Sequence, residues 1–411
     1  MQRLVCAEWG WAEYRDAMTG LARAHRDADA ALEVLLDAWA GFYPGVVPLP
    51  VNRGRFALSL ALRAFARLAP QKTEVVYPAY VCASVIEAIE QAGLVPVPAD
   101  IGPDLNMGVA EAARLVGDNT LAVIAVNVYG CPAPVAELEE FCRARGVFLI
   151  DDAACLGGIA AEDGRMLGGF GDAGVISFTA SKSIVTGGFN AGGLLLANNP
   201  ELAPALRREW EALPPSRSRL GDFLLFLRDQ QLEPYTRTAT YYWSALRRRL
   251  SPRYDGRPAC PPARMAEISA RVAMRQLASL PGRIAGRIRV ADSFRHCLAS
   301  VPEITFPQYA PERYLTRIVL QLPAGTVRAM VRAALRRRGI ATRRGYDLDL
   351  RFGNAFPRAL AVAPLLIEVP SHSRMEEAAV ERICAALGES LGTAAAAMPA
   401  GYRSRQPAAA E

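Results

Sequence analysis

Two lysines, Lys72 and Lys182, stand among the 47 basic residues of this 411-residue chain, and arginine supplies the rest. Arginine keeps its proton in a protein, whereas lysine can lose it and form a Schiff base with a carbonyl group. Lys182 follows the apolar run at residues 174–178 and a polar turn, so it is the candidate for amine chemistry. Alternatively, both lysines are remnants of a composition biased toward arginine, alanine, glycine and proline. Lys72, in the turn at residues 70–73, fits that interpretation.

Two adjacent aspartates, Asp151 and Asp152, follow the apolar run at residues 147–150. A carboxylate at the end of a buried strand costs free energy unless it meets a cation, and a protonated pyridine nitrogen is such a cation. A helix N-cap would explain one of the two aspartates equally well. We therefore expect Asp152 to contact a ligand and Asp151 to serve as a local cap or hydrogen-bond partner.

A third group of residues favours a phosphate site. Residues 52–58 form a turn that enters a helix, so the first amides of the helix and Arg55 would surround an anion. Many loops place glycine and arginine before a helix, so this motif is weak by itself. Ser177 lies five residues before Lys182, and glycines at 187, 188, 192 and 193 would let the backbone approach a cofactor closely.

These three groups each fall at the carboxyl end of a predicted strand, where ligands bind in open α/β sheets. An amine for a Schiff base, a carboxylate for a pyridinium nitrogen and a phosphate site together specify pyridoxal 5′-phosphate (PLP).

The order and spacing of these residues resemble the DegT/DnrJ/EryC1/StrS aminotransferases, fold-type-I PLP enzymes that mostly act on nucleotide-linked keto-sugars. The resemblance extends from about residue 50 to residue 390. The segments that carry it are 52–58, 78–80, 100–104, 129–130, 151–154, 171–172, 177–178, Lys182, 264–265, 339–340 and 370–372.

The resemblance implies roles for single residues. Lys182 would bind the cofactor covalently and then move a proton between the substrate carbon and the cofactor. Asp152 would pair with the pyridine nitrogen, and Ser177 would bind the phosphate. The turn residues that complete the phosphate site would be Gly54, Arg55 and Phe56. A dehydratase branch of the family has histidine in place of the lysine, so Lys182 favours amino transfer.

The chain also departs from the usual family pattern. Cys155 stands where a glutamine or histidine commonly contacts the cofactor's ring oxygen, and Cys82 stands where an aromatic residue often stacks on the ring. Tyr80 would take over that stacking. Asn127 occupies a position where histidine is frequent. Residues 261–263 lack the asparagine that reaches the partner subunit's phosphate in the family.

Short β-branched runs alternate with helical patterns, which predicts βαβ units and a parallel sheet. The resemblance implies the fold-type-I class: α/β, with a mostly parallel seven-stranded sheet and a smaller C-terminal α+β domain. The expected strands of the large domain are residues 75–77, 95–97, 121–126, 147–150, 175–178 and 194–197. The expected helices are residues 57–68, 81–91, 135–145, 265–277, 326–338 and 375–387, and a further strand is expected at 317–322.

This pattern divides the chain into four parts. They are an N-terminal helical arm at 1–50, a large PLP-binding domain at 51–255, a small C-terminal domain at 256–391 and a disordered tail at 392–411. The large domain carries a helical, aromatic insertion at about 201–260. In that insertion, apolar residues at 223–227 and aromatic residues at 241–243 precede three arginines at 247–249.

Composition excludes several functional classes. The eight cysteines are scattered and only three histidines are present, so neither a disulfide framework nor a metal site is expected. The net charge of +6 is modest and the arginines are spread along the chain, so a nucleic-acid partner is not expected. We expect a cytoplasmic protein, because no apolar run approaches the roughly 20 residues that a membrane span needs.

The sequence therefore predicts a PLP-dependent aminotransferase. It would convert a nucleotide-linked keto-sugar into an amino-sugar, with an amino acid such as glutamate as the amine donor. The resemblance also implies a homodimer. One alternative is a fold-type-I reaction on a non-sugar carbonyl or amino acid, and another is a PLP-binding, weakly catalytic regulatory or scaffolding homologue. The aromatic and basic insertion is commonly explained by burial in an interface or over the site, and less commonly by peripheral contact with an anionic membrane.

Overall fold

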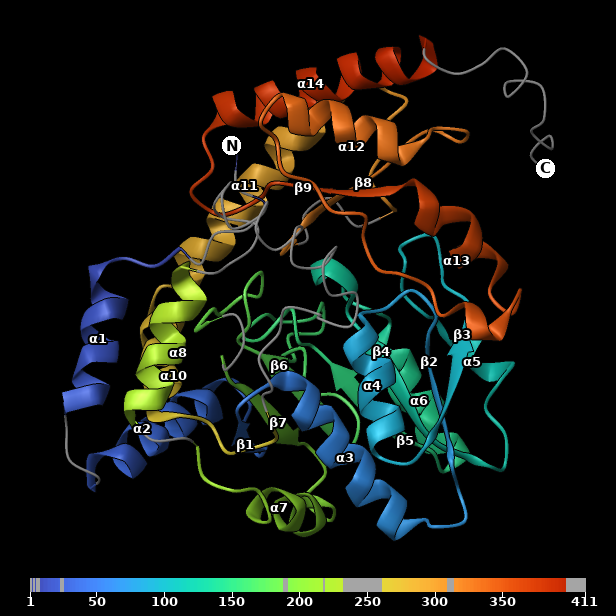
Figure 1. Cartoon of the computed structure of the whole chain (residues 1–411). Helices are drawn as coiled ribbons and strands as arrows, with labels where there is room; N and C mark the ends of the chain where they lie inside the picture. The colour runs from blue at the N-terminus through green and yellow to red at the C-terminus, as the bar shows by residue number, and fades with distance from the viewer. Residues whose placement is uncertain are drawn as a thin grey trace, which may run out of the picture.

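The computed structural model describes residues 2, 4, 8–22, 26–187, 191–216, 219–231, 261–308 and 314–396. A seven-stranded sheet lies in the lower half of Figure 1, with strand order β1-β7-β6-β5-β4-β2-β3. Its strands are β1 (Val47–Val51), β2 (Glu74–Pro78), β3 (Val95–Ala99), β4 (Thr120–Val126), β5 (Phe148–Asp152), β6 (Ala173–Ser177) and β7 (Gly193–Ala197).

All pairs from β3 across to β6 are parallel, and only β7 runs antiparallel to its neighbours β1 and β6. The predicted α/β class with a mostly parallel seven-stranded sheet is confirmed. Because parallel strands end at the same edge, residues that follow β5 and β6 are brought together there. Asp152 lies opposite Val175 in the register of this pair.

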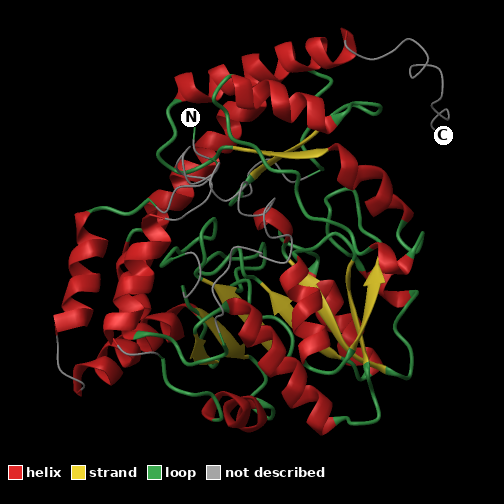
Figure 2. Ribbon diagram, viewed as in Figure 1, coloured by secondary structure: helices red, strands yellow, loops and turns green. Residues whose placement is uncertain are grey.

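Helices cover both faces of the sheet (Figure 2), so its interior strands are buried on both sides and read as continuous apolar runs. Leu194 and Leu196 face one core, whereas Leu195 faces the other. The first core includes residues of α2 (Arg26–Phe42), α6 (Val135–Arg145) and α10 (Glu267–Ala278). The second includes residues of α3 (Gly54–Leu68), α4 (Ala83–Gln91) and α7 (Ala203–Glu211). The short helix α5 (Val109–Ala113) follows β3.

The small domain lies at the top of Figure 1 and has a core of its own. The long helix α11 leads into it, and one face of a two-stranded antiparallel sheet packs against this helix and two others, α12 and α14. Its elements are α11 (Leu280–Leu298), β8 (Ile318–Gln321), α12 (Arg328–Arg337), α13 (Pro357–Val362), β9 (Leu366–Val369) and α14 (Glu377–Ala396).

The N-terminal region contains the predicted helices, α1 (Trp11–Ala22) and α2, but it also supplies a strand. β1 pairs with β7 from Val47 onward, so the sheet begins before the predicted boundary at residue 51. Pro48 and Pro50 interrupt the usual strand pattern. A proline lacks the amide that a central strand would use, and β1 lies at the edge, where that loss is tolerated.

The structure bears on two predictions about the second half of the chain, the disordered tail and the aromatic insertion. Residues 392–396 are helical, because α14 continues to Ala396, and its alanines are strong helix formers. The remainder of the predicted tail lies outside the described residues. In the insertion, α8 (Arg219–Gln231) buries Phe223 and Phe226 against α1 and α10 of the same chain, rather than in an interface or over the site. Residues 241–243 and 247–249 lie outside the described part.

In the part of the chain that the structure describes, no helix is both long and apolar enough to cross a membrane.

Candidate active site

Lys182 lies in a closed loop after β6. The Thr186 amide donates to the Phe178 carbonyl at 2.9 Å, and the Ala180 amide donates to the Gly187 carbonyl at 2.9 Å. Ser181, which precedes the lysine, has a φ of 72°. A non-glycine residue adopts this left-handed conformation only where its surroundings hold it there. The loop therefore fixes the backbone of the lysine.

The sheet brings the amine of Lys182 to a thiol and a carboxylate. Lys182 Nζ donates to Cys155 Sγ at 3.1 Å. Asp152 is buried at the end of β5 and accepts a hydrogen bond from the Ala154 amide at 3.0 Å. Burial raises the pKa of Asp152, and the positive charge of Lys182 opposes that rise without cancelling it. A carboxylate in this environment gains from a nearby cation.

Asp151 has a different environment from Asp152. Its carboxylate is fully buried and accepts hydrogen bonds from Asn127 Nδ2 at 2.8 Å and from the Gly168 amide at 2.5 Å. Burial raises the pKa of Asp151 to about 7. The prediction that Asp151 is a hydrogen-bond partner is confirmed. Asn127 links β4 to β5, because its Nδ2 also donates to the Asp152 carbonyl at 3.1 Å.

Gly174 in β6 lies against the turn that contains Gly168, whose amide binds Asp151, and only a glycine fits there. A Cβ on Gly174 would stand 1.8 Å from the carbonyl oxygen of Gly168, so any larger residue would move the turn. The turn and strand therefore approach each other at a distance that only glycine permits.

The start of α3 meets the end of β6 at the place where the sequence predicts a phosphate site. A Cβ on Gly54 would lie 2.8 Å from the Cβ of Ser177, and Ser177 Oγ lies 3.1 Å from Thr179 Oγ1. The side chain of the N-cap residue, Arg53, makes no capping hydrogen bond to the helix. First-turn amides of a helix together with two hydroxyl groups suit a phosphate. The residues present therefore fit PLP, with Lys182 and Asp152 at the neighbouring strand ends.

The other predicted phosphate ligands have partners within the chain. Arg55 Nη1 donates to Glu87 Oε2 on α4 at 2.5 Å. The amide of Phe56 donates to the Arg53 carbonyl at 3.0 Å, within the turn. The sequence gives no signal for the Arg55 pair with Glu87, because the two residues are 32 positions apart.

Tyr80 joins two other tyrosines at the junction of the domains. Its hydroxyl lies 2.7 Å from that of Tyr129 and accepts from the Tyr346 amide at 3.2 Å. The rings of Tyr129 and Tyr346 stack at 4.9 Å. Burial raises the pKa of Tyr80, so its hydroxyl stays protonated. Gly345 has a φ of 60°, and a Cβ there would lie 2.2 Å from the Tyr80 hydroxyl.

Sequence reasoning missed Tyr346, which follows an arginine pair with no recognisable motif. The sequence predicts that Tyr80 stacks on the cofactor ring, and this stays a prediction. In the structure, the Tyr80 ring packs against those of Tyr129 and Tyr346, with centroids 6.1 and 5.5 Å away. Cys82 is exposed and accepts a hydrogen bond from Ser84 Oγ at 3.1 Å. Lys72 lies at the surface, where its Nζ donates to the Gly146 carbonyl at 3.0 Å.

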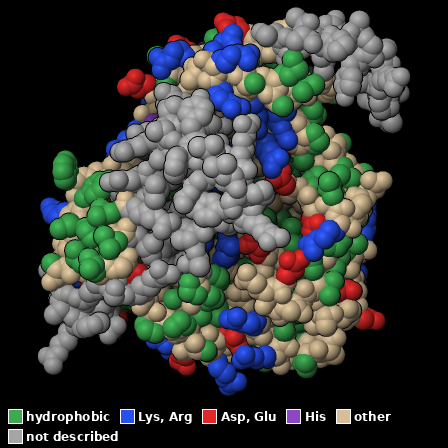
Figure 3. Space-filling model, viewed as in Figure 1, with side chains coloured by type: hydrophobic (Ala, Val, Ile, Leu, Met, Phe, Trp, Pro, Cys, Tyr) green, Lys and Arg blue, Asp and Glu red, His purple; other side chains and the backbone are tan. Residues whose placement is uncertain are grey.

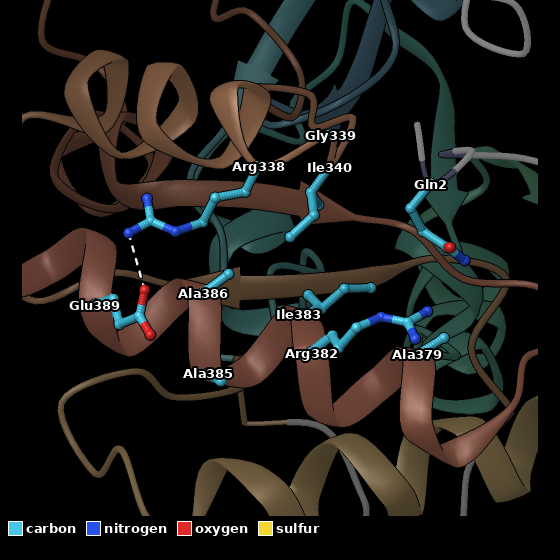
Figure 4. Close-up of a pocket in the computed structure, with 10 residues that line it drawn as sticks. All are labelled: Gln2, Arg338, Gly339, Ile340, Ala379, Arg382, Ile383, Ala385, Ala386 and Glu389. Carbon is cyan, nitrogen blue, oxygen red and sulfur yellow. Dashed lines mark hydrogen bonds and ion pairs between the residues drawn. The ribbon is translucent and has the colours of Figure 1, made fainter.

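A separate groove lies on the small domain between the end of α12 and α14 (Figure 4). Arg338 and Glu389 line it and pair with each other at 2.9 Å. It shares no lining residue with the Lys182 site and contains no lysine. We therefore assign the chemistry to the strand ends rather than to this groove.

Comparisons with known proteins agree with this geometry. The model of the DegT/DnrJ/EryC1/StrS aminotransferase family matches residues 40–388. The dTDP-4-dehydro-2,3,6-trideoxy-D-glucose 4-aminotransferase of Saccharopolyspora spinosa is 28% identical over 309 residues, which are 71% of this chain and 72% of that protein.

Two solved structures show the same fold. Helicobacter pylori PseC, an aminotransferase involved in the biosynthesis of pseudoaminic acid, has a TM-score of 0.74 at 16% identity, covering 96% of this chain and 99% of that one. A 3-amino-5-hydroxybenzoic acid synthase has a TM-score of 0.72 at 20% identity, covering 96% and 100%. Because the family model matches well over half of the chain, the protein belongs to the DegT/DnrJ/EryC1/StrS family of PLP-dependent aminotransferases.

Proposed function

We propose that the protein transfers an amino group from an amino acid such as glutamate to a nucleotide-linked keto-sugar. The observation that carries this proposal is the position of Lys182, whose amine lies 3.1 Å from Cys155 in electrostatic contact with the buried Asp152. Family membership supports amino transfer, and the similar enzyme from Saccharopolyspora spinosa acts, by its name, on a dTDP-linked keto-sugar.

Each residue of the site has a proposed task. When bound, PLP supplies a protonated ring that withdraws electrons from the reacting carbon. Asp152 would keep the ring nitrogen protonated, because a buried carboxylate is stabilised by a cation. Lys182 would bind the cofactor and then carry a proton to and from the substrate carbon. Ser177, with the Gly54 turn, would hold the phosphate, and Cys155 would contact the cofactor ring.

A second candidate function is amination of a non-sugar carbonyl. It is favoured by the shared fold with 3-amino-5-hydroxybenzoic acid synthase, whose name indicates a product that is not a sugar. A regulatory homologue is less favoured, because the chain retains both Lys182 and Asp152.

We also propose a cytoplasmic homodimer. Exposed apolar side chains on α1 and α8 support a surface for contact with a second subunit. Trp11 and Met18 belong to α1, over which Figure 3 shows a hydrophobic area, and Leu220 and Leu224 are exposed on α8. Peripheral membrane contact remains a proposal that rests on the sequence at residues 241–249.

The substrate class is tested with purified holoenzyme, glutamate and a panel of dTDP-, UDP- and GDP-linked keto-sugars beside simple keto acids. We expect 2-oxoglutarate to form with a nucleotide-linked keto-sugar. Turnover confined to keto acids would reject the sugar assignment. Light scattering on the same preparation should give the mass of a dimer, and an active monomer would contradict that part.

Replacing Lys182 tests the covalent attachment. Lys182→Ala should remove the visible absorbance of the bound cofactor, because the amine beside Cys155 is lost. Lys72→Ala is the matched control and should leave the absorbance unchanged, since Lys72 is exposed at the surface. Borohydride reduction followed by peptide mass mapping should locate the cofactor at residue 182. Cofactor on residue 72 would reverse the assignment.

Replacing the two aspartates separately tests their division of roles. Asp152→Asn should lower turnover by ~100-fold or more with a smaller effect on cofactor affinity. Asp151→Asn should instead lower the free energy of unfolding by about 1–3 kcal/mol, because one of the donors Asn127 and Gly168 loses its acceptor. Steady-state kinetics and chemical denaturation separate the effects. Equal losses of turnover in the two variants would disprove the division.

Arg55 and its partner Glu87 give a matched pair of variants for the phosphate site. Arg55→Ser should weaken PLP binding by about 1–3 kcal/mol, the size of a charge-assisted contact. Glu87→Gln keeps the arginine and removes only its ion pair, so affinity should be maintained or increased. Cofactor retention during dialysis is the measurement. If Arg55→Ser retains PLP as well as the unmodified protein does, Arg55 serves only the pair with Glu87.

A further inference from the structure

The segment before α1 binds the Lys182 loop. Trp9 Nε1 donates to the Val185 carbonyl at 2.7 Å, across 176 positions of sequence. Another bond from the loop to a neighbouring segment runs from Ser183 Oγ to the Gly157 carbonyl at 2.9 Å. Both bonds lie within three residues of Lys182. The backbone bonds at Phe178 and Ala180 close the two ends of the loop. The bonds from Trp9 and Ser183 hold its middle, at residues 183–185.

Packing fixes the position of the Trp9 indole. Its ring stacks on Phe226 of α8 with centroids 4.8 Å apart and an interplanar angle of 18°. Tyr14 of α1 meets it edge-on at 6.3 Å. Because two helices hold the ring, the indole N–H points to one place, and the Val185 carbonyl is there.

Glu8, which precedes Trp9, is bound by two arginines of α11 and by Ser373. Its side chain is only 1% exposed. Its Oε2 pairs with Arg283 at 3.2 Å, and its Oε1 pairs with Arg287 at 3.2 Å, both on α11. Ser373 adds its amide at 2.9 Å and its hydroxyl at 2.5 Å. Burial alone would raise the pKa of Glu8, but Arg287, Arg283 and Ser373 together lower it, so it is ionised at neutral pH.

The residues that bind Glu8 connect it to the small domain and, through Thr316, to Tyr129. Ser373 precedes α14, and Arg287 Nη1 donates to the Thr316 carbonyl at 2.7 Å. The amide and the hydroxyl of Thr316 each donate to the Tyr129 carbonyl at 2.9 Å. The φ of Glu8 is 59°, a conformation that its bonds must maintain. Two consecutive residues thus join the Lys182 loop to the small domain.

We propose that Glu8 and Trp9 are positioning residues that set the place of the Lys182 amine relative to the small domain. Without the indole N–H, residues 183–185 lose the bond to Trp9 and keep the Ser183 bond to Gly157. The amine then samples more positions relative to Asp152 and Cys155, which both interact with it. Misplacement affects the proton transfers more than substrate binding, so kcat should fall while KM stays nearly constant.

The test variant is Trp9→Phe, which keeps an aromatic ring against Phe226 and removes the N–H. We expect kcat to fall by about 10-fold, well below the ~100-fold that a displacement of about 1 Å can cause. KM should change by less than about 2-fold. The pH midpoint of the bound cofactor's visible absorbance should also shift, which a purely structural loss would not produce. The control is Trp11→Phe. Trp11 is 89% exposed, and the substitution keeps an aromatic ring on the proposed contact surface, so none of these values should change.

Glu8→Gln tests the other half of the link. It preserves shape and removes the charge between Arg283 and Arg287, so the same absorbance midpoint should shift. If the two residues act as a unit, the double variant should lose less kcat than the product of the single losses. Independent, fully multiplicative losses would overturn the link, and so would a Trp9→Phe protein that matches Trp11→Phe.

This inference rests on the proposed role of Lys182, and borohydride mapping decides that role separately. Cofactor fixed on Lys182 together with unchanged kinetics and titration in Trp9→Phe would reject the positioning role alone. Cofactor fixed elsewhere would reject the proposed function first, and the positioning role with it.

Discussion

The burial of two adjacent carboxylates at the end of β5 is the constraint on which the site depends. Neighbouring buried carboxylates repel each other and lose their hydration, so each needs its own compensation. Asp151 obtains it from Asn127 on the β4 side and from the turn at Gly168. Asp152 has one backbone donor and the charge of Lys182. The fold therefore gives the first aspartate two hydrogen-bond donors from other segments, whereas the second has one local amide and the charge of Lys182, which is consistent with the proposed contact to the cofactor's ring nitrogen.

The strands of the sheet could be predicted where the residues of the strand itself indicate its burial. Five of the seven strands lie inside the sheet, and they were found as continuous apolar runs. The edge strand β3 was also found, although Pro96 and Pro98 interrupt it. The other edge strand, β1, was missed: Pro48 and Pro50 interrupt it, and it directly follows the predicted helical arm. α11 was missed for a related reason. Its inward side includes Arg283 and Arg287, which break the apolar period of an ordinary buried helix.

The same distinction separates the predicted part of the site from the rest. Lys182, Asp152 and Ser177 follow strands, so their types and spacing can be read from short segments. Tyr346 and Trp9 cannot be read in this way. Each makes a hydrogen bond to the site region across more than 170 positions of sequence, and these contacts depend on how the domains pack.

Two strained residues explain why these distant contacts matter. Ser181, beside the lysine, and Tyr129, at the end of β4, both have positive φ, which costs of order 1–3 kcal/mol for each residue. Neither conformation is favoured by the local sequence. Tyr129 is held by Thr316, and the loop of Ser181 is held partly by Trp9. These supports come from the small domain and the N-terminal arm. The large domain therefore carries Lys182 and Asp152, whereas strained backbone beside them is held by contacts from both other parts of the chain.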